Sequence, residues 1–371
     1  MEDAQSTAVA QYDLIVVGGG PAGSACAITA ARTGARVLLL EKDTFPRHKV
    51  CGEFVSSESL RLLESLVAGS GSEGLDFDSR PEIASARILV GDTSVEFPIA
   101  PPAKSIPRFE LDEALCRSGR RCGVRVEEDV TVHAVNQNGL FTVQSSSNEF
   151  TARAVVNATG RWSQLTRYQT AGKVKWIGLK AHFREAAPRA SVDLYFFNGG
   201  YCGVQPVRGD TVNACAMVQP GVARSLEEVF AAHPRLWRRS REWEICFPAI
   251  TTSPLYFRKP ETCAQGMILA GDSAGFIDPF AGDGISLALH SGALAGECLA
   301  GFLQGRFSWD DTHRRYRTAY LRRLAPAFRS ARALRMLLSA PSWLSSRLVS
   351  LAATKPVSRL IVRATRAKES P

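Results

Sequence analysis

Three glycines near the beginning of the chain have the spacing of a phosphate-binding turn. Gly18, Gly20 and Gly23 occupy the glycine positions of a G-x-G-x-x-G pattern. The first glycine permits a tight turn, the second lets the backbone approach a diphosphate, and the third lets a helix pack closely on a strand. Pro21 and Ala22 suit a first helical turn, whose free N–H groups and partial positive charge attract anions. The pattern predicts a site for the diphosphate of a dinucleotide.

The segments around this turn complete a β-α-β unit. Residues 12–18 and 36–41 are apolar runs typical of buried parallel strands, and the helix between them is expected to end near Gly34. Glu41 follows Gly23 by 18 residues, at the end of the second strand, where its carboxylate would hold the adenosine ribose hydroxyls. Lys42, the next residue, is expected to contact the same dinucleotide.

A second glycine-rich segment follows a short predicted strand at residues 267–270. This strand would deliver Asp272 as an acceptor for a polyol hydroxyl. A long helix is expected from about residue 284 to 302, and its first amides would face the same bound cofactor. The candidate cofactor residues in this segment are Gly271, Asp272, Pro279, Gly282, Asp283, Gly284 and Ile285.

Hairpin and strand signals occupy the middle of the chain, with Asn138-Gly139 as the strongest turn. The order of elements predicts an α/β protein with a Rossmann-like cofactor lobe, an inserted antiparallel substrate lobe and a C-terminal helical extension. The cofactor lobe is expected to be discontinuous. The expected ranges are 12–82, 106–173 and 260–310 for the cofactor lobe, 83–105 and 174–259 for the substrate lobe, and 311–371 for the extension.

The charge of the chain is concentrated in that extension. The net charge is +9, and residues 310–371 hold 14 Lys/Arg against 3 Asp/Glu, so the other 309 residues sum to about −2. A nucleic-acid partner is therefore not expected. Apolar residues at helical spacing (Leu334, Leu337, Leu338, Leu344, Leu348 and Leu351), divided by Pro341 and Pro356, predict about three helices. They would form either a cap on the substrate lobe or a peripheral contact with an anionic membrane surface.

The cysteines and the apolar runs suggest the compartment. Nine scattered cysteines without a C-x-x-C pair argue against a metal site and against disulfides, so a reducing cytoplasm is expected. The first eleven residues do not resemble a signal peptide, and no stretch has the roughly 20 apolar residues of a membrane span. His182 and His290 lack metal-ligand spacing and are assigned no chemistry.

These motifs resemble the flavoprotein family that unites para-hydroxybenzoate-type hydroxylases with geranylgeranyl reductases, over roughly residues 12–302. The resemblance implies that FAD is the cofactor, that Asp272 binds the flavin ribityl chain, and that Arg108 lies near the flavin's phosphate and ribose region. Thr159 stands where the family's middle motif usually has Asp. The segment Arg47–Glu53 is similar to the Cys-Gly motif of the reductase branch, in which Cys51 would lie beside the flavin.

Cys51 is the candidate catalytic residue, which would donate a proton or steer flavin reactivity if the neighbouring Arg47, His48 or Lys49 lowers its pKa. The alternative is a small buried hydrophobe. Since a second G-x-G-x-x-G is absent from the sequence, NAD(P)H would dock only transiently as electron donor.

Three functions fit a hydrophobic small-molecule substrate. Hydroxylation through an oxygen adduct at flavin C4a is slightly favoured, because Gly203 and Gln205 break a signature of the reductase branch. Reduction of C=C bonds in an isoprenoid is the alternative, and Gly282–Ile285 favours that branch. A third possibility is a non-redox isomerase, cyclase or lipid-binding protein.

Overall fold

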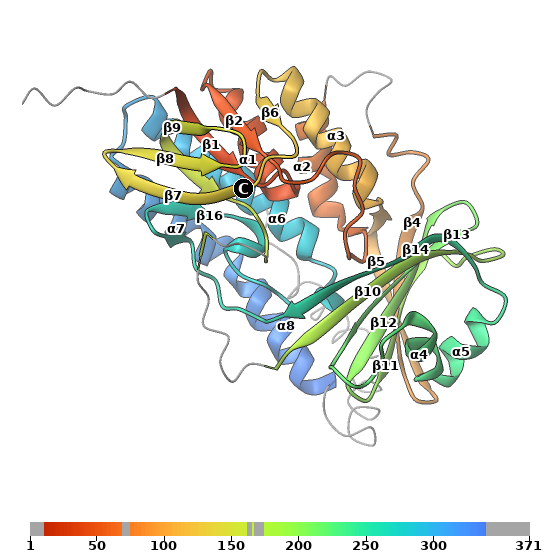
Figure 1. Ribbon diagram of the computed structural model, residues 1–371. Coiled ribbons are helices and arrows are strands. Elements are labelled where there is room, and N and C mark those ends of the chain that lie inside the picture. The colour runs from red at the N-terminus through yellow and green to blue at the C-terminus, as the bar shows by residue number, and fades with distance from the viewer. Residues whose placement is uncertain (1–10, 69–74, 162–164, 167–173, 339–371) are drawn as a thin grey trace, which may run out of the picture.

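A computed structural model describes residues 11–68, 75–161, 165–166 and 174–338, which form two eight-stranded sheets with helices packed on them (Figure 1). The first sheet has the order β15-β16-β9-β1-β2-β6, and the hairpin β7–β8 joins it through β9. Its strands are β1 (Tyr12–Val17), β2 (Val37–Leu40), β6 (Arg125–Glu127), β7 (Val132–Asn138), β8 (Leu140–Ser145), β9 (Glu149–Asn157), β15 (Cys263–Ala264) and β16 (Met267–Leu269).

The central strands of this sheet are parallel, so their carboxyl ends meet at one edge. Val17 at the end of β1 pairs with Leu40 of β2 and with Asn157 of β9. Leu269 at the end of β16 also pairs with Asn157. The segments that follow β1, β2 and β16 therefore lie together, at the position where open α/β sheets bind ligands.

Two helices pack closely beside this edge. α1 (Pro21–Ala31) consists largely of small residues and lies along α6 (Gly284–Leu303). A Cβ atom on Gly292 of α6 would lie 2.0 Å from the carbonyl oxygen of Ala22, so only glycine permits this approach. The apolar α6 meets the length and hydropathy criteria for a membrane span, contrary to the expectation from sequence, but 72% of that window is buried in the protein.

The second sheet has the order β14-β10-β13-β12-β11-β4-β5-β3. One of its faces carries a core formed with α4 and α5, and the other faces the first lobe (Figure 1). Its strands are β3 (Phe54–Val55), β4 (Glu82–Val90), β5 (Thr93–Ser105), β10 (Trp176–Arg184), β11 (Ser191–Phe197), β12 (Gly200–Arg208), β13 (Thr211–Val218) and β14 (Glu244–Leu255); the two helices are α4 (Leu226–Ala231) and α5 (Pro234–Ser240).

The remaining helices are α2 (Ser57–Val67), α3 (Arg108–Arg121), α7 (Trp309–Arg323) and α8 (Ala325–Leu338). The predicted α/β class with a cofactor lobe, a second lobe and C-terminal helices is confirmed, but the second sheet is not wholly antiparallel, because β4 and β11 pair in parallel. One detail differs from the expected ranges: β3 lies within 12–82 but pairs with β5 of the second sheet. The predicted helices beyond Leu338 lie outside the described residues.

Candidate functional site

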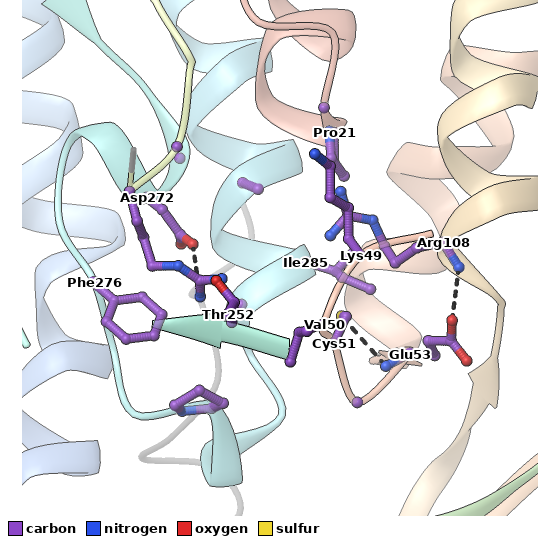
Figure 2. A pocket seen from close by; sticks show the side chains of 18 of the residues that line it. Pro21, Lys49, Val50, Cys51, Glu53, Arg108, Thr252, Asp272, Phe276 and Ile285 are labelled. Atoms are coloured by element: carbon purple, nitrogen blue, oxygen red, sulfur yellow. Dashed lines mark hydrogen bonds and ion pairs between the residues drawn. The ribbon is translucent and has the colours of Figure 1, made fainter. Parts of the chain in front are cut away.

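A cavity of about 790 Å³ lies between the two sheets and reaches the N-termini of α1 and α6. It lies within the size range of ligand clefts. All but one of the residues predicted from sequence line it; Gly23 is the exception. The lining residues of this group are Gly18, Gly20, Pro21, Ala22, Glu41, Lys42, Cys51, Arg108, Gly271, Asp272, Pro279, Gly282, Asp283, Gly284 and Ile285, several of which are labelled in Figure 2.

The glycine turn has the geometry of a diphosphate cradle. Gly18 has φ +105°, and a Cβ atom there would lie 2.5 Å from the carbonyl oxygen of Ala158. A Cβ atom on Gly23 would lie 1.8 Å from the carbonyl oxygen of Gly18, so Gly23 closes the turn from behind instead of lining the cavity. The N-terminus of α1 has no side-chain cap. These residues fit the diphosphate of FAD, whose charge the first amides of α1 would stabilise.

Glu41 and Arg108 both lie close to this turn. The Glu41 carboxylate accepts a hydrogen bond from the Gly19 amide (2.6 Å) and one from Arg47 Nη2 (3.1 Å). Arg108 forms two 2.8 Å bonds with Asp112, and its Nη2 would lie 3.8 Å from a Cβ atom on Gly20. Arg108 therefore lies beside the turn at the place expected for a residue near the phosphates. Contacts of both side chains with FAD remain predictions.

The late glycine-rich segment provides the other side of the cradle. Asp272 lines the cavity with its carboxylate 30% exposed and 3.5 Å from Arg161 Nη1. Gly282 has φ +75°, and a Cβ atom there would press on the Phe54 ring at 3.0 Å. The helix α6 then begins after Asp283, which leaves its first turn facing the cavity.

Cys51 lies in the cavity wall, and the basic residues that precede it in the chain contact other groups. Arg47 Nη2 lies 3.1 Å from Glu41 and 3.6 Å from Asp112, and Lys49 pairs with Asp43. The ring of His48 stacks on Phe247 with the centroids 3.5 Å apart. Carboxylates next to the motif in space therefore pair with both Arg47 and Lys49. Figure 2 shows Cys51 between Thr252 and Glu53.

The structure also reveals a buried charged cluster that the sequence did not indicate. Glu53, which lines the cavity, accepts hydrogen bonds from Lys180 Nζ and from the Arg108 amide (3.0 Å), and its Oε2 lies 2.8 Å from His182 Nε2. Burial alone would raise the pKa of Glu53, but the positive charge of Lys180 and the hydrogen bond with His182 outweigh it and lower that pKa. His182, to which no chemistry was assigned, thus contacts the site through Glu53.

A second buried carboxylate lies in the late glycine-rich segment. Asp278 accepts a hydrogen bond from the Phe280 amide (3.3 Å) and pairs with Arg335 of α8. Tyr201 Oη lies 3.5 Å from Asp278 Oδ1. Burial raises the pKa of Asp278 to about 6, although the Arg335 charge opposes the shift. The guanidinium of Arg335 also lies over the rings of Phe257 (3.9 Å) and Trp176 (4.4 Å).

The part of the cavity formed by the second sheet is mainly apolar. The strands β4, β5, β11, β12 and β14 contribute side chains to it, and Phe276 and Phe280 close it from the late segment. The apolar residues contributed by these strands are Ala86, Ile88, Phe97, Ile99, Val192, Leu194, Tyr201 and Ile250. A hydrophobic molecule would therefore be accommodated between this sheet and the cofactor cradle.

Comparisons with known proteins agree with this arrangement. Residues 13–46 match the family model of the FAD dependent oxidoreductases. A digeranylgeranylglycerophospholipid reductase of Methanocella arvoryzae is 29% identical, with 78% of each chain covered. A 1H-pyrrole-2-carbonyl-[peptidyl-carrier protein] brominase of Pseudoalteromonas luteoviolacea is 23% identical, with 82% of this chain and 81% of the brominase covered.

A solved structure has the same fold. It is that of a geranylgeranyl bacteriochlorophyll reductase-like protein from Thermoplasma acidophilum, with a TM-score of 0.77, 20% identity and 95% of each chain covered. Together with the glycine turn and the cavity, these likenesses support FAD as the cofactor and show that the chain is similar to FAD-dependent oxidoreductases, among them a reductase and a brominase.

Proposed function

We propose that this protein is an FAD-dependent reductase of C=C bonds in a hydrophobic, isoprenoid-like molecule, with NAD(P)H as a transient electron donor. The observation that carries the proposal is the place of Cys51. Its side chain lines one continuous cavity that also includes the cofactor turn and the apolar face of the second sheet. A proton donor at this position can reach a substrate bound against the cofactor.

The sequence motifs slightly favour hydroxylation over reduction, whereas two further observations support reduction. Cys51 lines the cavity and is only partly buried, although it also packs against an apolar core. The identity to the digeranylgeranylglycerophospholipid reductase, 29%, also exceeds the 23% to the brominase. Both observations favour the reductase branch.

The residues of the chain would divide the work as follows. The α1 amides and Arg108 hold the diphosphate, and Asp272 orients the ribityl chain. Apolar side chains of the second sheet hold the substrate and exclude water. Bound FAD, once reduced, supplies a hydride to one alkene carbon. Cys51 would donate the proton to the other carbon and would later regain a proton from solvent. A lipid substrate would also suit a basic C-terminal extension that contacts an anionic membrane surface.

The test is an anaerobic reaction of the full chain with bound FAD. NAD(P)H should bleach the flavin, and a polyprenyl substrate should restore its colour without oxygen. Cys51→Ala should still bleach but should lose the substrate-dependent step by at least about 100-fold, as expected for loss of a general acid. Cys246→Ala removes an exposed cysteine and is the control. Reoxidation by Cys51→Ala at the wild-type rate would reject the role of Cys51.

An oxygen-dependent reaction is the second candidate, because the brominase is similar over 82% of this chain. Substrate-stimulated oxygen uptake, together with no anaerobic reoxidation by polyprenyl compounds, would replace the reductase proposal by this one.

A further inference from the structure

The cavity side of the second sheet carries buried polar residues where apolar ones are usual. Side chains alternate along a strand, so Leu179 and Ala181 of β10 enter the core with α4 and α5, while Lys180 and His182 point the other way. Asn213 of β13 alternates in the same manner. Lys180 is 0% exposed, and a fully buried lysine is rare unless it is paired.

These side chains converge on one short segment, the turn formed by Cys51, Gly52 and Glu53. Asn213 Nδ2 donates to the carbonyl oxygen of Cys51 (3.0 Å). Lys180 Nζ donates to the carbonyl oxygen of Lys49 (3.3 Å) and to the Glu53 carboxylate. Together with the contact between His182 and Glu53, these bonds attach the turn and the preceding Lys49 to the neighbouring strands β10 and β13.

The conformation of the turn requires such attachment. Glu53 has φ +63°, a left-handed conformation that costs a residue other than glycine free energy. Its amide approaches Cys51 Sγ at 3.4 Å. On the other side of the turn, the Ile106 amide donates to the Glu53 carbonyl oxygen (2.9 Å). Without the hydrogen bonds from β10 and β13, the flexible Gly52 would let the turn adopt other conformations.

We propose that Lys180 and Asn213 are positioning residues for Cys51, which hold its turn so that the thiol faces the cavity between cofactor and substrate. This inference rests on the proposed function only for the proton that Cys51 delivers. The attachment itself does not depend on the reaction. It assigns a role to two buried residues, 129 and 162 positions away from Cys51, that neither the glycine motifs nor the cysteine motif includes.

The test measures the position of Cys51 without turnover. The full chain with bound FAD is treated with iodoacetamide at neutral pH, and mass spectrometry gives the alkylation rates of Cys51 and of the exposed Cys246. In Lys180→Met, Cys51 should react about tenfold faster, because the turn opens more often once two anchoring bonds are lost. Asn213→Ala, which removes one bond and no charge, should give a smaller rise. The rate at Cys246 should not change.

A matched control and a double variant separate positioning from general loosening. Thr211→Val, on the same strand and face as Asn213, should leave the Cys51 rate unchanged. Lys180→Met combined with Glu53→Gln removes both members of the buried pair. The double variant should therefore be more stable than Lys180→Met alone, while the alkylation of Cys51 stays faster than in the wild type. If both the stability and the alkylation rate of Cys51 return to wild-type values in the double variant, the pair is only structural and the proposal fails for Lys180.

The same variants should lower kcat for alkene reduction more than they change KM. Wild-type alkylation of Cys51 in both Lys180→Met and Asn213→Ala would overturn the proposal, whether or not alkene reduction is observed. Faster alkylation in a protein that does not reduce alkenes would reject only the proposed function.

Discussion

Glu53 and Asp278 are both buried carboxylates beside the same cavity, yet their environments shift their pKa values in opposite directions. Glu53 is 0% exposed and Asp278 is 5% exposed, so burial disfavours both charges. Glu53 has Lys180, His182 and an amide as partners, and its pKa is lowered. The pKa of Asp278 is raised to about 6.

The opposite pKa shifts of the two carboxylates follow from the cation that each one faces. Lys180 is fully buried, and Glu53 is its carboxylate partner. Arg335 is 21% exposed and divides its contacts between Asp278 and two aromatic rings, and burial lowers its own pKa. A buried charge pair is favourable only when its partners compensate the lost hydration. The turn of Cys51 is therefore held by the buried ion pair of Glu53 and Lys180, whereas the environment of Asp278 favours its protonated form.

The largest effect is expected for Glu53→Gln. This change leaves Lys180 buried opposite a neutral group, which should lower the free energy of unfolding at pH 7.5 by about 3–5 kcal/mol. Because the folded-state pKa of Glu53 is lowered, its contribution is present above its ordinary pKa of 4.5 and is lost as pH falls through the folded value. Urea unfolding at several pH values measures the loss.

Glu82→Gln is the matched control for this experiment. Glu82 also pairs with a lysine on the second sheet, at 3.8 Å from Lys104, but its side chain is 63% exposed. Its loss should change stability by less than about 1 kcal/mol. If Glu53→Gln were as stable as the wild type at pH 7.5, the ion pair of Glu53 and Lys180 would not stabilise the fold.

Asp278→Asn should change the free energy of unfolding in the opposite direction to Glu53→Gln. A rise in pKa from 3.8 to about 6 means that the fold favours the protonated form, so the charged form lowers stability above pH 6. At pH 7.5 the variant should be more stable than the wild type by about 2–3 kcal/mol, at about 1.4 kcal/mol for each pKa unit. The gain should shrink as pH falls from 6 to 4. A loss of stability at pH 7.5 would show that the Arg335 pair outweighs burial.

Part of the site could be predicted from the sequence, but the partners of these two carboxylates could not. The glycine turn, Glu41 and the late segment were predictable because each depends on residues close together in the chain and on the regular geometry of parallel strands. Lys180 and Glu53 are 127 positions apart, the first in β10 and the second in the turn that precedes β3. Their pairing depends on how the second sheet packs beneath the turn, and no local pattern encodes that packing. The periodicity of β10 shows that Lys180 and His182 share a face, but not what that face meets.

The smallest effect is expected for Tyr201→Phe, which tests whether cations alone decide the comparison. Burial raises the pKa of Tyr201 well above 10, so its hydroxyl stays protonated and donates to Asp278 over a long 3.5 Å contact. Loss of this bond should cost less than about 1 kcal/mol. It should also move the pH midpoint of the Asp278 effect slightly upward, because the bond favours the charged carboxylate. A double-mutant cycle with Asp278→Asn measures the coupling. A coupling larger than the whole Asp278→Asn effect would mean that neutral donors, and not the exposure of Arg335, set the difference between the two carboxylates.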